Sequence, residues 1–205
     1  WATANNSIIV LPESPVWSIS LAGDFHMWDV KEGESAKDVQ LFDDLRTCIA
    51  ESFTVDLNQI VLAGFSGGAL FNTVLLGERA ESIAAAVSFS GGADVDIAIF
   101  EEMIAPYSTP ASSVPVLVVA GGEQDVWPDP SFTLVDFVAA TDVLQEQLVA
   151  DGHTAVRCDH SLGHTIPMNL FEIGQSWLLE HSLGSPSPYD DEIPTAWSSC
   201  YLASE

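Results

Sequence analysis

The stretch that decides the fold is IVLAGFSGGAL, residues 60–70. An apolar run typical of a buried strand leads directly into G-x-S-x-G, and a helix-forming segment follows it. This is the context in which a serine nucleophile lies on a tight turn between a strand and a helix. We expect Gly64 and Gly68 to pass close to each other there, which lifts the Ser66 hydroxyl clear of the sheet. Ser66 is therefore the predicted nucleophile, and the backbone N–H of Gly67 is a predicted donor to an oxyanion.

Two later segments supply a carboxylate and an imidazole, in the chain order expected after such a serine. Val116–Ala120 has the composition of a buried parallel strand, and Asp125 lies in the loop just past it. A shorter strand is predicted at 154–158, and His164 lies in the loop that follows. Because active sites of open α/β sheets form at the carboxyl ends of the strands, these residues are predicted to complete a Ser-His-Asp triad.

Other residues compete for these roles. Glu123 and Asp129 flank Asp125, but Asp125 is better placed within its loop. His160 lies one helical turn before His164, whereas the glycine just before His164 and the proline-started helix after it favour His164. No metal or other cofactor is predicted, because no zinc-like spacing is formed by the remaining histidines, His26, His153 and His181.

Residues 38–184 resemble the esterase branch of the α/β-hydrolases that includes polyhydroxybutyrate depolymerase-like enzymes, feruloyl and acetylxylan esterases, and phospholipase/carboxylesterases. The resemblance is carried by VDLNQI at 55–60, GFSGG at 64–68, GEQDVWP at 122–128 and GHTIP at 163–167. It implies a carboxylic-ester hydrolase that works through an acyl-enzyme without a cofactor. We expect short-chain or polymeric esters as substrates, polyesters and aromatic ones included. The alternatives are a degenerate, non-catalytic binding domain and an acyltransferase that uses the same triad.

The alternation of strands and helices predicts a compact α/β-hydrolase fold, with a mostly parallel sheet of about five strands and helices on both faces. Strands are predicted at 7–11, 59–64, 83–90, 116–120 and 154–158, and helices at 35–53, 67–76, 132–150 and 167–183. An irregular excursion is expected at 91–113. The domain is predicted to span 1–184, with 185–205 as an acidic C-terminal tail packed on it.

This count falls short of the family pattern, in which eight strands are usual and the loop after the third donates the second oxyanion N–H. The chain thus resembles a hydrolase that is shortened at its N-terminus. In one interpretation it is a compact active enzyme, with 7–11 paired beside the nucleophile strand and Ser14 supplying the missing donor. In the other it is a degenerate member with half an oxyanion hole. We expect the active enzyme, as a monomer or as a homodimer through the exposed edge at 7–11.

Aromatic residues near the predicted site indicate an apolar substrate cleft. No segment of the length of a helical lid intervenes between the strands, which favours an open cleft suited to bulky or polymeric esters. The residues predicted to line it are Phe65, Trp127, Trp17 and Trp28.

Thirty acidic residues against five basic ones give a formal net charge of −25. This charge excludes nucleic acid and anionic membrane surfaces as partners, because little is present to neutralise phosphates. It is typical of a solvated acidic surface, or of a protein adapted to high salt. No apolar run is long enough to span a membrane. A secreted or periplasmic location is expected in preference to a cytoplasmic one.

Three cysteines leave the redox state open. Cys48 falls on the apolar stripe of the helix predicted at 35–53 and is expected to be buried. Cys158 and Cys200 are the candidate disulfide, which would tie the C-terminal tail to the last predicted strand.

Overall fold

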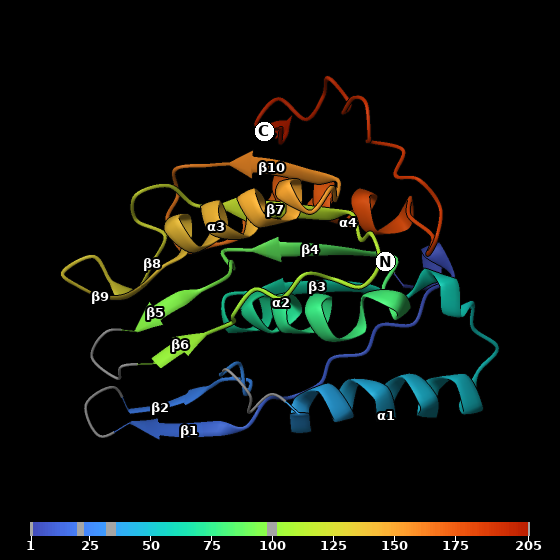
Figure 1. Ribbon diagram of the computed structural model, residues 1–205, viewed down its shortest axis with the longest axis horizontal. Helices are drawn as coiled ribbons and strands as arrows, with labels where there is room; N and C mark the ends of the chain where they lie inside the picture. Colours follow the sequence, from blue (N-terminus) through green and yellow to red (C-terminus); the bar gives the residue numbers. More distant parts are fainter. Residues whose placement is uncertain (1, 20–22, 32–35, 98–101, 205) are drawn as a thin grey trace.

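A five-stranded sheet forms the centre of the protein (Figure 1). The computed structural model describes residues 2–19, 23–31, 36–97 and 102–204. Four strands run parallel, and the strand at one edge runs antiparallel to its neighbour. Their spatial order is β11 (Cys200–Leu202), β10 (Ala155–Asp159), β7 (Val116–Ala120), β4 (Ala85–Phe89) and β3 (Val61–Phe65).

The strands β4 and β7 lie at the centre because, apart from Ser88, their sequences are apolar. Every residue of both strands is buried, and the pairing sets Val87 opposite Leu117. Such continuous apolar runs suit strands that are covered on both faces. By contrast, β3 lies at the opposite edge of the sheet from β11, and two of its five residues are exposed. The strand that carries the G-x-S-x-G turn is therefore an outer strand.

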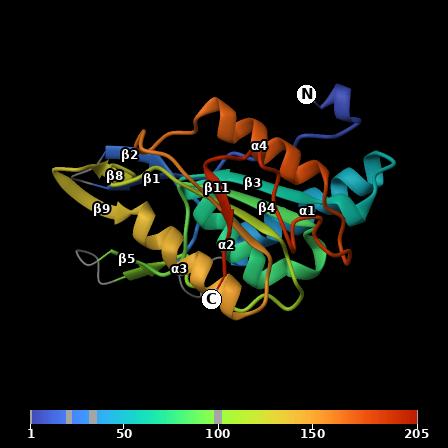
Figure 2. The same cartoon turned by 90° about the horizontal axis from the view of Figure 1, so that it is seen from above.

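Helices cover both faces of this sheet (Figure 2). On one face α2 (Gly67–Arg79) and α3 (Phe137–Ala150) bury side chains such as Leu70 and Leu144 against Val116 and Val118. The first helix, α1 (Ala36–Ser52), joins the same core through Val39. On the opposite face α4 (Met168–Leu179) packs with the C-terminal tail. The described residues also form three short 3₁₀ turns: η1 (Thr3–Asn5), η2 (Leu57–Gln59) and η3 (Ala80–Ser82).

The second face depends on the tail as much as on α4. Trp177 of α4 is fully buried and stacks on Tyr189, whose ring in turn contacts Trp197. At the end of the tail, β11 pairs with β10, and Cys158 and Cys200 form a disulfide across this pair. The tail is thus built into the sheet and the core.

The fifth strand of the sheet is not the predicted one. Residues 7–11 form no strand, and Ile8, Ile9, Val10 and Leu11 expose 42–87% of their surface. An apolar run with high strand propensity becomes a strand only where a partner edge accepts its hydrogen bonds. The antiparallel strand β11 takes the fifth place instead.

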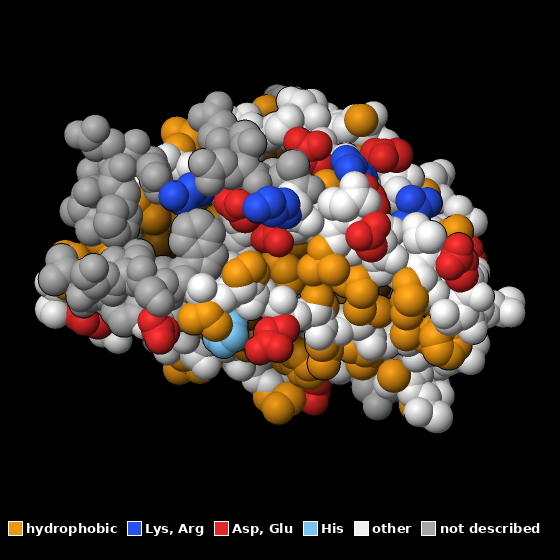
Figure 3. Space-filling view, turned by 90° about the horizontal axis from the view of Figure 1, so that it is seen from below, with side chains coloured by type: hydrophobic (Ala, Val, Ile, Leu, Met, Phe, Trp, Pro, Cys, Tyr) orange, Lys and Arg blue, Asp and Glu red, His pale blue; other side chains and the backbone are white. Residues whose placement is uncertain are grey.

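Figure 3 shows hydrophobic side chains gathered in a band on the face seen from below, the side of α1, β1 and β2 in Figure 1.

Three β-hairpins stand outside the central sheet. The first is formed by β1 (Val16–Ile19) and β2 (Gly23–His26). The second joins β5 (Val95–Ile97) to β6 (Glu102–Ile104), within the stretch predicted to be irregular. The third joins β8 (Val126–Asp129) to β9 (Phe132–Asp136).

All four predicted helices are found, but their ends differ from the predicted bounds. The helix predicted at 132–150 begins only at Phe137, because Asp136 caps it by accepting hydrogen bonds from the N–H groups of Val138 and Ala139. The helix predicted at 35–53 is found as α1, and Ser35 lies outside the described residues. Cys48 of α1 is exposed with a free thiol, which corrects the expected burial. No helix within the described part of the chain is long and apolar enough to span a membrane.

Candidate active site

Ser66 lies on the turn between β3 and α2 with a backbone φ of 55° and ψ of −125°, a conformation rare for a residue with a side chain. Its N–H donates to the carbonyl of Phe89 at the end of β4, and its own carbonyl accepts from Leu70 in α2. The turn needs glycine at position 64, where a Cβ atom would lie 2.4 Å from the carbonyl oxygen of Gly68. At Gly68 a Cβ atom would meet nothing within 4 Å, so close approach demands glycine only at the first position.

Asp125 lies in the loop after β7 and is completely buried. Its Oδ2 atom accepts a hydrogen bond from the N–H of Gly121 at 2.7 Å. Its Oδ1 atom lies 2.8 Å from Nδ1 of His164. The Asp125 N–H donates to the carbonyl of Gly122, which closes the loop on itself. Both carboxylate oxygens are therefore engaged, and the carboxylate points at the imidazole.

His164 lies in the loop after β10, and its Nε2 atom is 2.9 Å from the Ser66 hydroxyl. Its loop locks onto the Asp125 loop, because the N–H of Gly163 donates to the carbonyl of Gly121. This approach leaves no room for a side chain, since a Cβ atom at Gly121 would lie 2.2 Å from the Gly163 carbonyl oxygen. The structure thus brings Ser66, His164 and Asp125 into one hydrogen-bonded chain.

The competing residues lie outside this chain. Glu123 is exposed, and Asp129 is exposed and bonded to Ser131, whose hydrogen bonds lower the pKa of Asp129. The Nδ1 atom of His160 accepts from the N–H of Leu162, and burial lowers the pKa of His160. The other histidines make contacts elsewhere: His26 with Ser14, His153 with Val114, and His181 with Trp177 and Ser187.

Two phenyl rings, those of Phe65 and Phe137, stack on the imidazole of His164. The Phe65 ring is stacked at a centroid distance of 4.7 Å, and the Phe137 ring is stacked on it at 4.4 Å. Phe65 immediately precedes the nucleophile, which a sequence can indicate. Phe137 is the first residue of α3 and carries no motif, so no sequence signal marks it.

The residues predicted to line the substrate cleft differ in how deeply they are buried. Phe65 exposes 37% of its surface beside Ser66. Trp127 is half-buried in β8 and packs against the core. Trp28 is buried and stacks on Phe71 of α2, so it belongs to the core and does not line a cleft. The side chain of Trp17 lies outside what the structure describes, although its backbone is part of β1.

The two predicted oxyanion donors are placed unequally. Gly67 follows Ser66 as the first residue of α2, where backbone N–H groups are free of helical partners. For Ser14, the contact described is between its carbonyl and His26 in the β1–β2 hairpin. The role of Ser14 stays a prediction.

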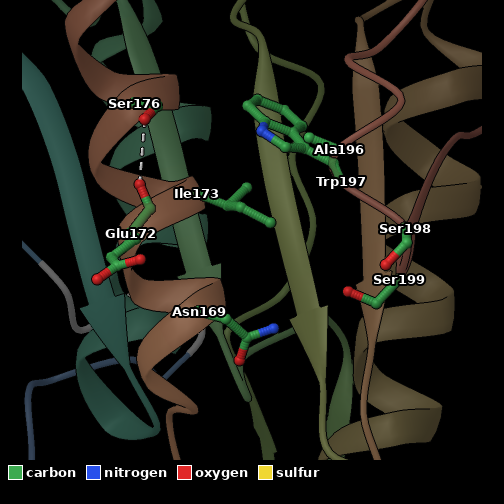
Figure 4. Close-up of a pocket in the computed structure, with 8 residues that line it drawn as sticks. All are labelled: Asn169, Glu172, Ile173, Ser176, Ala196, Trp197, Ser198 and Ser199. Atoms are coloured by element: carbon green, nitrogen blue, oxygen red, sulfur yellow. Dashed lines mark hydrogen bonds between the residues drawn. The ribbon is translucent and has the colours of Figure 1, made fainter.

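Two hollows lie away from Ser66. One of about 300 Å³ lies between α4 and the tail (Figure 4), lined by Asn169, Glu172 and Ser176 along the helix and by Ser198 and Ser199 of the tail. The other, of about 290 Å³, adjoins His153 and Asp190. Neither includes Ser66, Asp125 or His164 among its lining residues. Within the described ranges, no group of three or more His, Cys, Asp or Glu residues is arranged to hold a metal ion.

Comparison with known proteins gives similarity at the level of structure. No family model and no curated protein sequence matches the chain. The structure of pOPH in complex with pNPB superposes with a TM-score of 0.64 at 20% sequence identity, over 82% of this chain and 60% of that one. SOBER1 of Arabidopsis thaliana gives a TM-score of 0.64 at 15% identity, over 87% of this chain and 85% of that one. A thermostable esterase gives 0.52 at 21% identity, over 71% of this chain and 37% of that one.

The chain therefore spans about 60% of the length of pOPH and most of the length of SOBER1. At identities of 15–21%, these superpositions show a shared fold and nothing finer. With its parallel strands, its helices on both faces and its strand–serine–helix turn, this chain has the α/β-hydrolase fold of these proteins.

Proposed function

We propose that the protein is a serine carboxylic-ester hydrolase that works through an acyl-enzyme. The observation that carries the proposal is the continuous chain of contacts from the Ser66 hydroxyl through His164 to the buried carboxylate of Asp125. Because Nδ1 of His164 faces a carboxylate, it carries the ring proton, and Nε2 is left free to accept the hydroxyl proton. Ser66 lies on the turn that suits a nucleophile, and its base and the residue that orients the base are both in reach.

The reaction follows from these positions. Ser66 Oγ attacks the ester carbonyl carbon while its proton passes to Nε2 of His164, which becomes an imidazolium. The carboxylate of Asp125 stabilises that charge and holds the ring orientation, and Gly121 keeps the carboxylate in place. His164 then protonates the leaving alcohol, and an acyl group remains on Ser66. A water molecule, deprotonated by His164, releases the acid. The N–H of Gly67 donates to the oxyanion both when the acyl-enzyme forms and when water hydrolyses it.

The substrate is proposed as a short-chain or polymeric ester, aromatic polyesters included. Two features of the surface support this choice. The imidazole of His164 is 21% exposed, so the reacting atoms lie near the surface. Large apolar side chains are exposed close by in sequence, namely Phe65 at 37%, Leu162 at 66% and Met168 at 70%. A surface of this kind suits an uncharged, apolar acyl chain. The pOPH structure, at 20% identity, was obtained with pNPB.

Hydrolysis of a short-chain p-nitrophenyl ester tests the reaction. We expect Ser66→Ala to lower kcat by about 10⁶-fold and Asp125→Asn by about 10⁴-fold, with both variants folded. A fluorophosphonate probe should label the wild-type protein and not Ser66→Ala, because only an activated serine reacts at neutral pH. A wild-type protein that neither labels nor outpaces Ser66→Ala would be the non-catalytic binding domain instead.

Two further assays decide the substrate class and the acceptor. Release of soluble acid from a polyester film, compared with Ser66→Ala, tests the polymeric substrate, and equal release by the two would remove it. Addition of a primary alcohol to the p-nitrophenyl ester assay tests acyl transfer. A hydrolase yields mainly the free acid, whereas an acyltransferase yields mainly the new ester.

A further inference from the structure

The two phenyl rings that stack on His164, those of Phe65 and Phe137, come from different elements. Phe65 is the last residue of β3 and directly precedes Ser66, and its ring plane is inclined by 30° to the imidazole. Phe137 is the first residue of α3, and its ring plane is inclined by 15°. Both pairs are stacked, so both phenyl rings lie against a face of the imidazole and not against its edge.

We propose that Phe65 and Phe137 form an aromatic clamp that positions His164 and stabilises the positive charge that forms on it during the reaction. This inference rests on the proposed ester-hydrolase function and assigns two positioning residues to it.

The first part of the argument is geometric. His164 forms its hydrogen bonds to Asp125 and Ser66 through the two nitrogen atoms at the edge of its ring. These bonds lie near the ring plane, so they only weakly restrain tilting of the imidazole about the line that joins the two nitrogens. The phenyl rings are stacked against the faces of the imidazole, where they oppose tilting. Each phenylalanine is also attached to another residue of the hydrogen-bonded series Ser66–His164–Asp125. Phe65 directly precedes Ser66 in the sequence. Phe137 exposes only 2% of its surface, and its N–H donates to the carbonyl of Asp125 at 2.9 Å.

The second part is electrostatic. When Ser66 attacks, the imidazole takes up a proton and becomes a cation. The face of a phenyl ring carries partial negative charge, and a cation within about 6 Å of the ring centroid is attracted to it. Both centroids lie inside this limit, at 4.7 Å for Phe65 and 4.4 Å for Phe137. Because the charge exists only after proton transfer, the attraction favours the transition state over the bound ester.

The effect should therefore appear in kcat and leave KM nearly unchanged. For one ring, the attraction at a partly desolvated site corresponds to a rate change of about tenfold. Position 65 is suited to the test because its side chain is 37% exposed and tolerates replacement more readily than the buried Phe137.

The experiment measures kcat and KM for a short-chain p-nitrophenyl ester in a graded series at position 65. Incorporation of mono-, di- and trifluorophenylalanine keeps the shape of the ring but progressively removes the negative charge of its face. We expect log kcat to fall with each added fluorine, Phe65→Leu to lose about tenfold in kcat, and Phe65→Tyr to retain kcat within about twofold. The same fluorinated residues at Phe137 extend the test without a change of packing volume.

Phe53, which follows α1 and is 55% exposed, provides the matched control, because its fluorination should leave kcat unchanged. A kcat that is independent of fluorination at both position 65 and position 137 overturns the clamp, while the Ser66-dependent activity of the wild-type protein would leave the hydrolase proposal standing. A wild-type protein no faster than Ser66→Ala overturns the hydrolase proposal and the clamp with it.

Discussion

Replacement of Gly64 by alanine should disrupt the turn that carries Ser66, the proposed nucleophile. A Cβ atom there would lie 2.4 Å from the Gly68 carbonyl oxygen and 2.6 Å from the Ala69 nitrogen. Ordinary contact begins near 3.4 Å, so the end of β3 and the start of α2 must separate by about 1 Å. The obstructing atoms are backbone atoms, which cannot turn away as a flexible side chain would. Overpacking of this kind costs about 1–3 kcal/mol in stability, and a 1 Å displacement of a reacting group costs about 10²-fold in rate.

The assay compares Gly64→Ala with Gly68→Ala, by thermal melting and by p-nitrophenyl ester hydrolysis. Gly68 lies in α2, and its added Cβ atom would have open space. Gly68→Ala should therefore fold normally, gain up to about 1 kcal/mol in stability from helix propensity and keep its activity within about threefold. The reasoning is refuted if Gly64→Ala melts and reacts like the wild-type protein, or if the two replacements are equally damaging.

Three further predictions concern stability. Cys200→Ser opens the disulfide to Cys158, which closes a sequence separation of 42, and should lower the free energy of unfolding by about 4 kcal/mol, or about 8–16 °C in Tm. Cys48→Ser removes only an exposed free thiol, and equal Tm losses in the two variants would contradict this. Burial lowers the pKa of His181 below its ordinary value of 6.5, so the unfolded chain binds protons first and stability should fall as the pH drops below about 6.5. His181→Gln should show a smaller loss of Tm between about pH 8 and about pH 5.5, and an undiminished loss would disprove the assignment. The net charge of −25 should make Tm and activity rise from low to molar salt, and a falling Tm would count against adaptation to salt.

The sequence was most informative about the residues around Ser66. The order of the motifs and the apolar strands before them place Ser66, Asp125 and His164 at one end of a parallel sheet, and the structure brings these three together there. This succeeds because the carboxyl ends of parallel strands lie at a common edge, so that position along the chain predicts position in space.

The sequence failed where a structure depends on a distant partner. Residues 7–11 have strand propensity but no strand to pair with, whereas the three-residue β11 is a strand because β10 and Cys158 hold it. The stacking of Phe137 on His164 joins two loops and a helix start, and no local pattern records it. Trp28 was predicted to line the cleft, yet its ring stacks on Phe71 of α2 in the core. Propensity and periodicity describe neighbours in sequence and do not describe such contacts.

The placement of β3 at the border of the sheet has a consequence for protein engineering. The contacts that unite Ser66, Asp125 and His164 arise from the loops after β3, β7 and β10, together with the Phe89 carbonyl at the end of β4. A segment of roughly one hundred residues, from Val61 to Thr165, therefore holds every backbone turn on which their convergence depends. Transfer of the proposed Ser-His-Asp chemistry to another scaffold therefore requires four adjacent parallel strands and two interlocking glycine-bearing loops.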